Sequence, residues 1–286
     1  MNYQKAIGIF LAAIMLMSIG TYFFAGPLSN QNGNQNDVSQ APGFDTIPGT
    51  KLDQELNSLQ DGLSMTPEGI TVASYVDYSR VYGTPLQVLA PNITDVYSVY
   101  NSMIMQRYSA YNDSGNFGFE AHIIYPEVIN FEYMLSEQPY NGYYMLSRNS
   151  QVYNIVGSPM LLGPRDSLEQ VIDVTSGNLG NSSDFARIMP YIEAGAEYQL
   201  LTSTDSIAAQ HYLEFRSADE GNTYTRTEVF VEPQQSLLEN ISALEANSTE
   251  RGLAYNVTSY DSDNVTKVMI TTNATNFYNL ALEQLR

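Results

Sequence analysis

The sequence predicts an α+β fold in which antiparallel sheets carry helices on one face. Short segments of alternating apolar and polar residues, typical of strands, recur along the chain, and segments of helical periodicity separate groups of them. Most strand-to-strand connections are short turns, and no regular alternation of strand and helix is present, which favours antiparallel pairing. Both halves of the body mix strands with helices of similar length, so a duplicated ferredoxin-like unit is an arrangement that this class leaves open.

The first half of the body begins with a strand over residues 70–77. Thr94 is expected to cap a helix whose apolar stripe runs from Val96 to Arg107. The turn Asn112–Gly115 leads into a strand over residues 116–124. Further strands are expected at residues 130–135, 142–147 and 152–157.

Two helices should connect the halves. Gly163-Pro164 opens the first, which Gly177 closes; its apolar face holds Leu168, Val171 and Ile172. Ser183 is expected to cap the second, over residues 184–194, with Gly195 at its end and an apolar side made of Phe185, Ile188, Met189 and Ile192.

The second half repeats the mixture of strands and helices. Strands are expected at residues 197–203, 211–216, 223–231, 253–260 and 265–272. Pro233 begins a helix with Leu237, Leu238, Ile241 and Leu244 on one side, and Thr275 begins the last helix. The expected organisation is an N-terminal membrane anchor or uncleaved signal at 1–26, a flexible polar stalk at 27–50, and α+β domains at 51–195 and 196–286.

Residues 6–25 form an uncharged apolar segment, AIGIFLAAIMLMSIGTYFFA. A helix needs about 20 such residues to cross the bilayer, whereas the apolar part of a secretory signal is shorter. We expect a retained anchor; a signal cleaved near Ser18-Ile19-Gly20 and a pilin-type leader cut after Lys5-Ala6 are the alternatives. Lys5 precedes the segment and no further basic residue occurs before Lys51, so the N-terminus should lie inside and the body outside the cell.

Asparagine sequons point to the same side of the membrane. Random placement of 24 Asn and 46 Ser plus Thr would give roughly four Asn-x-Ser/Thr motifs, and eight are present. Turn-rich, Asn-rich sequence can produce such an excess without any modification. The candidate glycosylation sites are Asn92, Asn112, Asn181, Asn240, Asn247, Asn256, Asn264 and Asn273, of which Asn112 is preferred because it lies in a predicted hairpin turn.

Composition excludes several classes of function. The net charge of −19 arises from only 12 Lys plus Arg against 31 Asp plus Glu, so no basic patch can neutralise nucleic-acid phosphates. The absence of Cys removes disulfides, thiol catalysis and thiolate metal sites. No glycine-rich phosphate loop and no nucleophile elbow occur, and neither a catalytic residue nor a cofactor site is predicted.

A few residues remain as candidates for chemistry. His122 shares a strand face with Glu120, which could begin a zinc or general-base site, but no further ligand is apparent, no metal site is predicted, and His122→Ala is expected to cost little. His211 should be a core or edge histidine on the face of Leu213 and Phe215. The acidic turn Asp261–Asp263 hints at weak calcium binding, although a solvated turn explains it.

The tyrosine-rich run 133–153 is the last candidate. It could offer a sugar-stacking surface, but packing between strands explains the same residues more simply.

One stretch resembles an uncharacterised group of exported, membrane-anchored α+β proteins of archaea and bacteria. It comprises residues 140–173, YNGYYMLSRNSQVYNIVGSPMLLGPRDSLEQVID, with the later NSSDFARIMPYI and the earlier Thr66-Pro-Glu-Gly-Ile70. In that group a Tyr-x-Gly strand precedes an Ile-Val-Gly strand, a Val-Ile-Asp helix and a Ser-x-x-Phe helix. The base-poor, Asn- and Tyr-rich composition is similar to that of methanogen cell-surface proteins. The resemblance implies export and an α+β fold, and no activity.

Together these features predict a single-pass glycoprotein of the cell membrane, held by the lipid bilayer through residues 6–25, with its body outside the cell. We expect a non-catalytic binding or structural module with a protein or cell-envelope partner. The alternative is an envelope glycan or peptide hydrolase that uses a carboxylate pair, because two acids at a suitable separation are all that such an enzyme requires.

Overall fold

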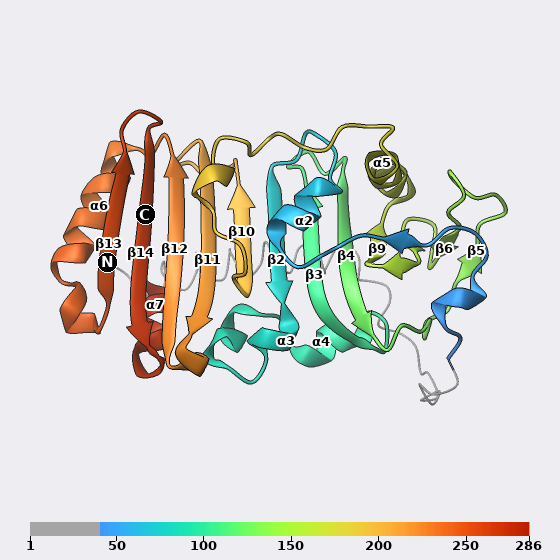
Figure 1. Cartoon of the computed structure of the whole chain (residues 1–286), viewed down its shortest axis with the longest axis horizontal. Coiled ribbons are helices and arrows are strands. Elements are labelled where there is room, and N and C mark those ends of the chain that lie inside the picture. Colours follow the sequence, from blue (N-terminus) through green and yellow to red (C-terminus); the bar gives the residue numbers. More distant parts are fainter. Residues whose placement is uncertain (1–40, 286) are drawn as a thin grey trace.

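The structure, a computed structural model, describes residues 41–285. Its centre is a 12-stranded antiparallel sheet, seen face-on in Figure 1, with the strand order β13-β14-β12-β11-β10-β2-β3-β4-β9-β7-β6-β5. The predicted α+β class with antiparallel pairing is therefore confirmed. The strands of this sheet are β2 (Val72–Asp77), β3 (Met103–Tyr111), β4 (Gly118–Tyr125), β5 (Met134–Leu135), β6 (Met145–Ser147), β7 (Tyr153–Ile155), β9 (Met160–Gly163), β10 (Tyr198–Thr202), β11 (Gln210–Ala218), β12 (Thr223–Val231), β13 (Ala254–Tyr260) and β14 (Val265–Asn273).

The sheet is continuous across the expected domain boundary near Gly195. Strand β10, which follows that boundary, pairs with β2 from the first half, with Tyr198 opposite Val76. Meanders β2–β3–β4 and β10–β11–β12 build most of the sheet. Within residues 41–285, one part of the sheet has the split arrangement of a ferredoxin-like fold. It consists of β12, helix α6 (Gln235–Ala246) and β13, with β14 inserted between the two strands. The structure thus contains one such unit within residues 41–285 and differs from the expected duplication.

Helices cover both faces of the sheet rather than the single face expected. We call the face that carries Val76 and Phe230 the first face; α3 (Tyr78–Val81), α4 (Ile93–Ser98), α6 and α7 (Phe277–Leu282) pack on this side. The second face carries Tyr75 and Val229, and α2 (Leu59–Ser64) and α5 (Arg165–Thr175) pack there. The reason lies in the central strands: all six residues of β2 are buried, so both sides need a cover.

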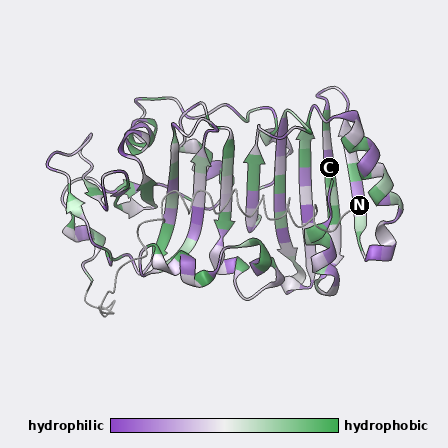
Figure 2. Ribbon diagram, turned by 180° about the vertical axis from the view of Figure 1, so that it is seen from behind, coloured by the Kyte–Doolittle hydropathy of each residue, from purple (hydrophilic) through white to green (hydrophobic). Residues whose placement is uncertain are grey.

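Polar and apolar residues alternate along the strands, as Figure 2 shows from behind. A separate parallel pair, β1 (Leu52–Asp53) with β8 (Gly157–Ser158), fixes the extended segment that crosses the second face in front of β9, β4 and β3 to reach α2 (Figure 1). The sheet is therefore enclosed by backbone as well as by helices.

One predicted helix is shorter than expected, and another is absent from the described residues. The stripe expected to continue to Arg107 ends early, because α4 stops at Ser98 and Asn101 adopts a left-handed conformation (φ 49°) that turns the chain into strand β3. The cap of α4 is Asn92 and not Thr94. Residues 183–195 contain only a short 3-10 turn, Met189–Tyr191, because Asp184 accepts hydrogen bonds from the backbone of Gly69 and Ile70.

The end of the expected stalk belongs to the body. Within residues 41–50, Ile47 is buried, Gly43 bridges Val128, and the Thr50 N–H donates to Gly142 O at 2.9 Å. Phe44 also packs against the core of the first face, so these apolar residues give the segment surface to bury and this part is not a free linker. The anchor at 1–26 and stalk residues 27–40 lie outside the described residues. Within residues 41–285 no helix has the length and apolarity needed to cross a membrane.

Candidate functional site

His122 lies in a buried cluster on the first face. Strand β4 places Glu120 and His122 two residues apart, and β3 brings Arg107 opposite His122. Arg107 Nη2 is 2.5 Å from Glu120 Oε1, and His122 Nε2 approaches Glu120 Oε2 to 2.9 Å, close in distance but not well aligned for a hydrogen bond. The Tyr100 hydroxyl lies 2.8 Å from the other ring nitrogen. The predicted pairing of Glu120 with His122 is confirmed, in a closed interior.

The charges in this cluster are fixed by burial and by Arg107. Burial lowers the pKa of His122 and outweighs the effect of Glu120, so the imidazole is neutral. Burial also opposes the Glu120 carboxylate, but the Arg107 charge and the His122 contact hold the pKa of Glu120 at about 2. A buried carboxylate that is held ionised by arginine is a structural ion pair rather than a general base. Because His122 is buried between two polar partners, the Tyr100 hydroxyl and the Glu120 carboxylate, replacing it should cost more than the sequence indicated.

His211 lies in a second buried cluster on the same face. Its Nε2 is 2.7 Å from Glu228 Oε2 and its Nδ1 is 3.2 Å from Asp205 Oδ2, while its ring stacks on Phe230. Burial lowers the pKa of His211, but the hydrogen bonds to Asp205 and Glu228 outweigh it and leave the pKa raised. Arg226 completes the cluster, with Nη2 2.5 Å from Glu228 Oε1. The predicted core histidine is confirmed, and its two carboxylate partners favour its charged form.

Arg226 also connects this cluster to the C-terminal helix, α7. Its Nη1 donates to the carbonyl oxygens of Leu280 and Glu283, at 3.1 and 2.6 Å. Both carbonyls lie at the C-terminal end of α7: Glu283 is its C-cap, and the Leu280 carbonyl also accepts the Glu283 N–H. The second cluster therefore fastens α7 to the first face.

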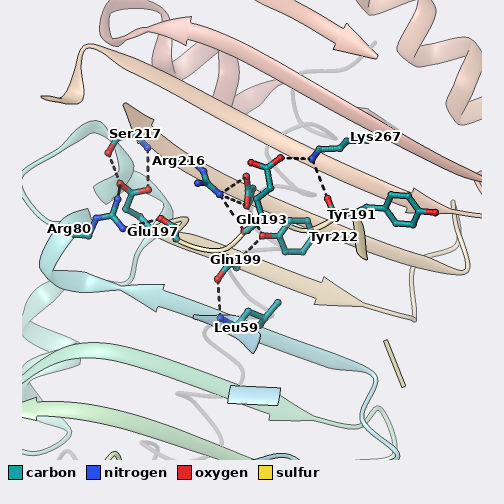
Figure 3. Close-up of polar contacts among 12 residues, drawn as sticks. Leu59, Arg80, Tyr191, Glu193, Glu197, Gln199, Tyr212, Arg216, Ser217 and Lys267 are labelled. Carbon is teal, nitrogen blue, oxygen red and sulfur yellow. Dashed lines mark hydrogen bonds and ion pairs between the residues drawn. The ribbon is translucent and has the colours of Figure 1, made fainter. Parts of the chain in front are cut away.

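A third group of polar contacts lies around β10 and β11, with Gln199 and Tyr212 on the second face (Figure 3). The buried Glu197 carboxylate accepts hydrogen bonds from Arg80 Nη2 at 2.6 Å and from Ser217 Oγ at 2.5 Å. Tyr212 donates to Glu214 at 2.7 Å and accepts from Gln199, whose other amide atom accepts the backbone N–H of Leu59. The network thus links the start of α2 to the strands beneath it.

Residues 178–195 are fastened over the same face. Lys267 on β14 donates to Tyr191 O at 3.2 Å and to Glu193 at 2.9 Å, and the Tyr191 hydroxyl donates to Asp263 (Figure 3 draws the Lys267 contacts). Asp263 is therefore used by a tyrosine rather than presented to a calcium ion. No group of three His, Cys, Asp or Glu within residues 41–285 is placed to hold a metal.

A surface hollow of about 300 Å³ lies between α2 and residues 181–189. No titratable side chain lines it, so it offers neither acid–base groups nor charged ligands. Its walls are Gln60, Leu63, Ser64, Asn181, Ser182, Ser183, Phe185, Ala186 and Met189.

Most of the tyrosine-rich run serves packing. Tyr140, Tyr143 and Tyr153 pack against the core of the second face and Tyr144 against that of the first, while the Tyr140 hydroxyl donates to Asp173 at 2.8 Å. Tyr133 is the exception and is exposed. The run does not form one aromatic platform, because its rings are divided between two faces.

The candidate glycosylation sites differ in access. Asn240 donates its amide to Gln284 O at 3.0 Å, and half-buried Asn112 accepts in its own turn from Ser114, Asn116 and Phe117. The preference for Asn112 is therefore weakened. The remaining six are exposed: Asn92, Asn181, Asn247, Asn256, Asn264 and Asn273.

Sequence reasoning did not identify Arg107, Asp205, Arg226 or Glu228. One signal was available for two of them: Arg226 and Glu228 are opposite charges two residues apart on a predicted strand, the spacing that also places Glu120 beside His122. Arg107 was placed on a helix, and Asp205 lies in a loop, so neither had a local pattern.

No protein-family model and no curated protein matches this chain. Among solved structures, the chain is similar to crystal form I of TP0453, with 9% sequence identity and a TM-score of 0.43. The match covers 82% of this chain and 98% of that chain. It is a weak structural likeness only.

Proposed function

We propose that this protein is a membrane-anchored extracytoplasmic protein whose body is a non-catalytic binding or structural module at the cell surface. One observation carries the proposal. Five of the eight sequons lie at one end of the sheet, whereas the chain enters the body at the other. Five sequon asparagines lie on or next to α6, β13 and β14: Asn240, Asn247, Asn256, Asn264 and Asn273.

The entry point lies beside the last strands at the opposite end. Gly43 bridges Val128, and Gly49 bridges Tyr143 just before β6. With neighbouring strands about 4.8 Å apart, eleven spacings separate β13 from β5 by roughly 50 Å. Glycans are bulky and hydrophilic, so an anchored body would carry them most easily at its membrane-distal end. This arrangement supports an anchor at 6–25 with the body outside.

The contacts of the buried acids support a non-catalytic role. Glu197 and Glu214 lie on adjacent strands, and each is already bound by an arginine and a hydroxyl group. Glu120 and Glu228 are paired with arginine and histidine, and the pKa of each is lowered. A hydrolase needs one carboxyl group with a raised pKa facing its substrate. The hydrolase alternative draws no support from these four residues.

Protease treatment of intact cells tests the proposal. We expect release of a soluble fragment whose N-terminus lies within residues 27–40. We also expect the native fragment to exceed its polypeptide mass, and Asn256→Gln to remove one glycan, whereas Asn240→Gln, whose amide is already bonded, leaves the mass unchanged. A body that resists protease in intact cells but not in lysed cells would overturn the outside assignment. If the body is outside, affinity capture of the intact protein from solubilised membranes would identify its partner.

A further inference from the structure

Large apolar side chains are exposed between the last residue of β4 and the end of β5, residues 125–135. Tyr125 and Met134 are 70% and 71% exposed, and Leu135 and Tyr133 are 40% and 36% exposed. They are four of the nine exposed large apolar side chains among residues 41–285. Such a concentration within residues 125–135 marks a surface that meets an apolar phase or partner.

The exposed residues are held in place. Met134 and Leu135 form β5 and pair with Ser147 and Leu146 of β6. Tyr133 packs on Phe131, with ring centroids 6.1 Å apart. Phe131 in turn lies under the Arg148 guanidinium, 3.8 Å from its carbon to the ring centroid. These side chains are therefore presented outward by a packed base.

The N-terminal segment enters the body at this same segment. Gly43 bridges Val128, and the Ile129 N–H donates to Pro42 O at 2.8 Å. The fifteen residues 26–40 separate this point from the expected anchor at 6–25. Fifteen residues reach at most about 50 Å, whatever their conformation. Such a tether keeps the β5 end near the bilayer at a high effective concentration, so a weak contact suffices.

The chemistry of the segment identifies the kind of surface it fits. Tyrosine, methionine and leucine suit the boundary between hydrocarbon and headgroups. The segment's own charged residues are Glu127, Glu132 and Glu137, with no Lys or Arg between residues 125 and 137. Arg148, which lies over Phe131, donates to Asn154 and to the Val99 carbonyl. The carboxylates must stay hydrated, which limits the contact to a shallow one, and they disfavour anionic lipid.

We infer that residues 125–135 are a second membrane contact, resting on the surface of a neutral bilayer beside the anchor. This inference rests on the proposed function, because the anchor brings the segment to the bilayer. It also fixes the orientation of the sheet, with β5 at the membrane and the sequons of β13 and β14 away from it.

The test uses the absence of tryptophan from the chain, which makes any introduced Trp a unique probe. Full-length Tyr133→Trp and Met134→Trp variants are reconstituted into phosphatidylcholine vesicles with or without bromine on the acyl chains. We expect brominated lipid to remove roughly half of the Trp emission at either position, as for an interfacial side chain. Tyr278→Trp is the matched control: Tyr278 is 62% exposed on α7, which packs against β12 and β14, and its emission should not change.

Extraction of the same vesicles with alkaline carbonate separates the two proposals. A chain that resists extraction but shows no quenching at 133 and 134 refutes the membrane contact and leaves the anchor intact. A chain that is extracted refutes the anchor, and quenching then still decides whether the segment binds lipid. Adding anionic lipid should weaken the quenching; stronger quenching, or equal quenching at Tyr278→Trp, would overturn the inference.

Discussion

His122 and His211 lie on the same face of one sheet, each beside a buried glutamate, and their pKa values are shifted in opposite directions. Burial disfavours the charged form of both rings. His122 faces one carboxylate that Arg107 already neutralises, so burial prevails. His211 lies between Glu228 and Asp205, and two carboxylates outweigh both burial and the nearby Arg226. The neutral form is therefore favoured at the first ring and the charged form at the second.

This difference predicts opposite pH dependences of stability. The pKa of His211 is raised in the folded state, so its contribution is complete below about pH 6.5 and is lost as pH rises through the folded pKa. The pKa of His122 is lowered, so its contribution is complete above about pH 6.5 and is lost as pH falls through the folded pKa. The free energy of unfolding, measured with urea between pH 5 and 9, should fall toward alkaline pH because of His211, and His211→Gln should remove that fall. His122→Gln should remove the corresponding fall toward acid pH. The same slope change from both variants would contradict the assignment.

Breaking the buried ion pair should be far more costly than breaking an exposed one. Glu120→Gln leaves the Arg107 charge buried without a counter-ion, and we expect a loss of about 3–5 kcal/mol in the free energy of unfolding. The control is Glu169→Gln, whose partner Arg165 is 51% exposed one helical turn away; it should cost at most about 0.5 kcal/mol. Similar losses from the two variants in urea unfolding would show that the Glu120 cluster is not a closed interior pair.

Elements with a strong local pattern could be predicted from sequence. Strand β12 occupies residues 223–231 as expected, because β-branched and aromatic residues make up most of the segment and the Ala218–Asn222 turn precedes it. Helix α5 begins after Pro164 and ends before Gly177, because proline and glycine favour those two positions. The apolar residues expected to face the sheet, Ile172 and Ile241, are both buried.

Features that depend on long-range pairing could not be predicted. The sequence of β3 fits the apolar stripe of a helix as well as it fits a strand. Asn101, in a left-handed conformation, turns the chain just before β3. The Arg107–Glu120–His122 cluster exists only because β3 and β4 pair in one register. The continuity of the sheet through β2 and β10 joins residues more than 100 positions apart, which no local pattern encodes.

Gly62 is required for α2 to lie against the sheet. A β-carbon at this position would be 2.1 Å from the Tyr108 ring, which is itself fully buried. Gly62→Ala should therefore push α2 away from the second face and lower the thermal midpoint by several degrees, as overpacked cores do. Gly180→Ala is the control, since no atom lies within 4 Å of its added carbon. Equal midpoints for the two variants would mean that α2 does not pack as described.

The body should keep its stability when divalent metals are removed. Asp263 accepts from the Tyr191 hydroxyl, and Asp261 lies exposed in the same turn. We expect a chelator to leave the thermal midpoint of the intact chain in detergent unchanged. A fall of several degrees, restored by added calcium, would show that this acidic turn binds the ion after all.

Because the sheet is continuous, we expect the cores on its two faces to unfold together. Ile172 on α5 packs on the second face in the first half of the body, and Ile241 on α6 packs on the first face in the second half. Ile172→Asp or Ile241→Asp places an unpaired charge in an apolar core. Either change should lower the free energy of unfolding enough to unfold the body. Leu179→Asp and Leu282→Asp are the controls, because these leucines are 44% and 50% exposed.

Limited proteolysis of these variants distinguishes one folding unit from two. Strand β10 pairs with β2 at five positions, so the halves share backbone hydrogen bonds across residue 195. If that pairing makes the sheet cooperative, either aspartate should expose cleavage sites throughout residues 51–285. A protease-resistant fragment ending near Gly195 in Ile241→Asp would instead show that the first half folds alone. In that case the boundary expected from sequence would mark a real unit of folding within a continuous sheet.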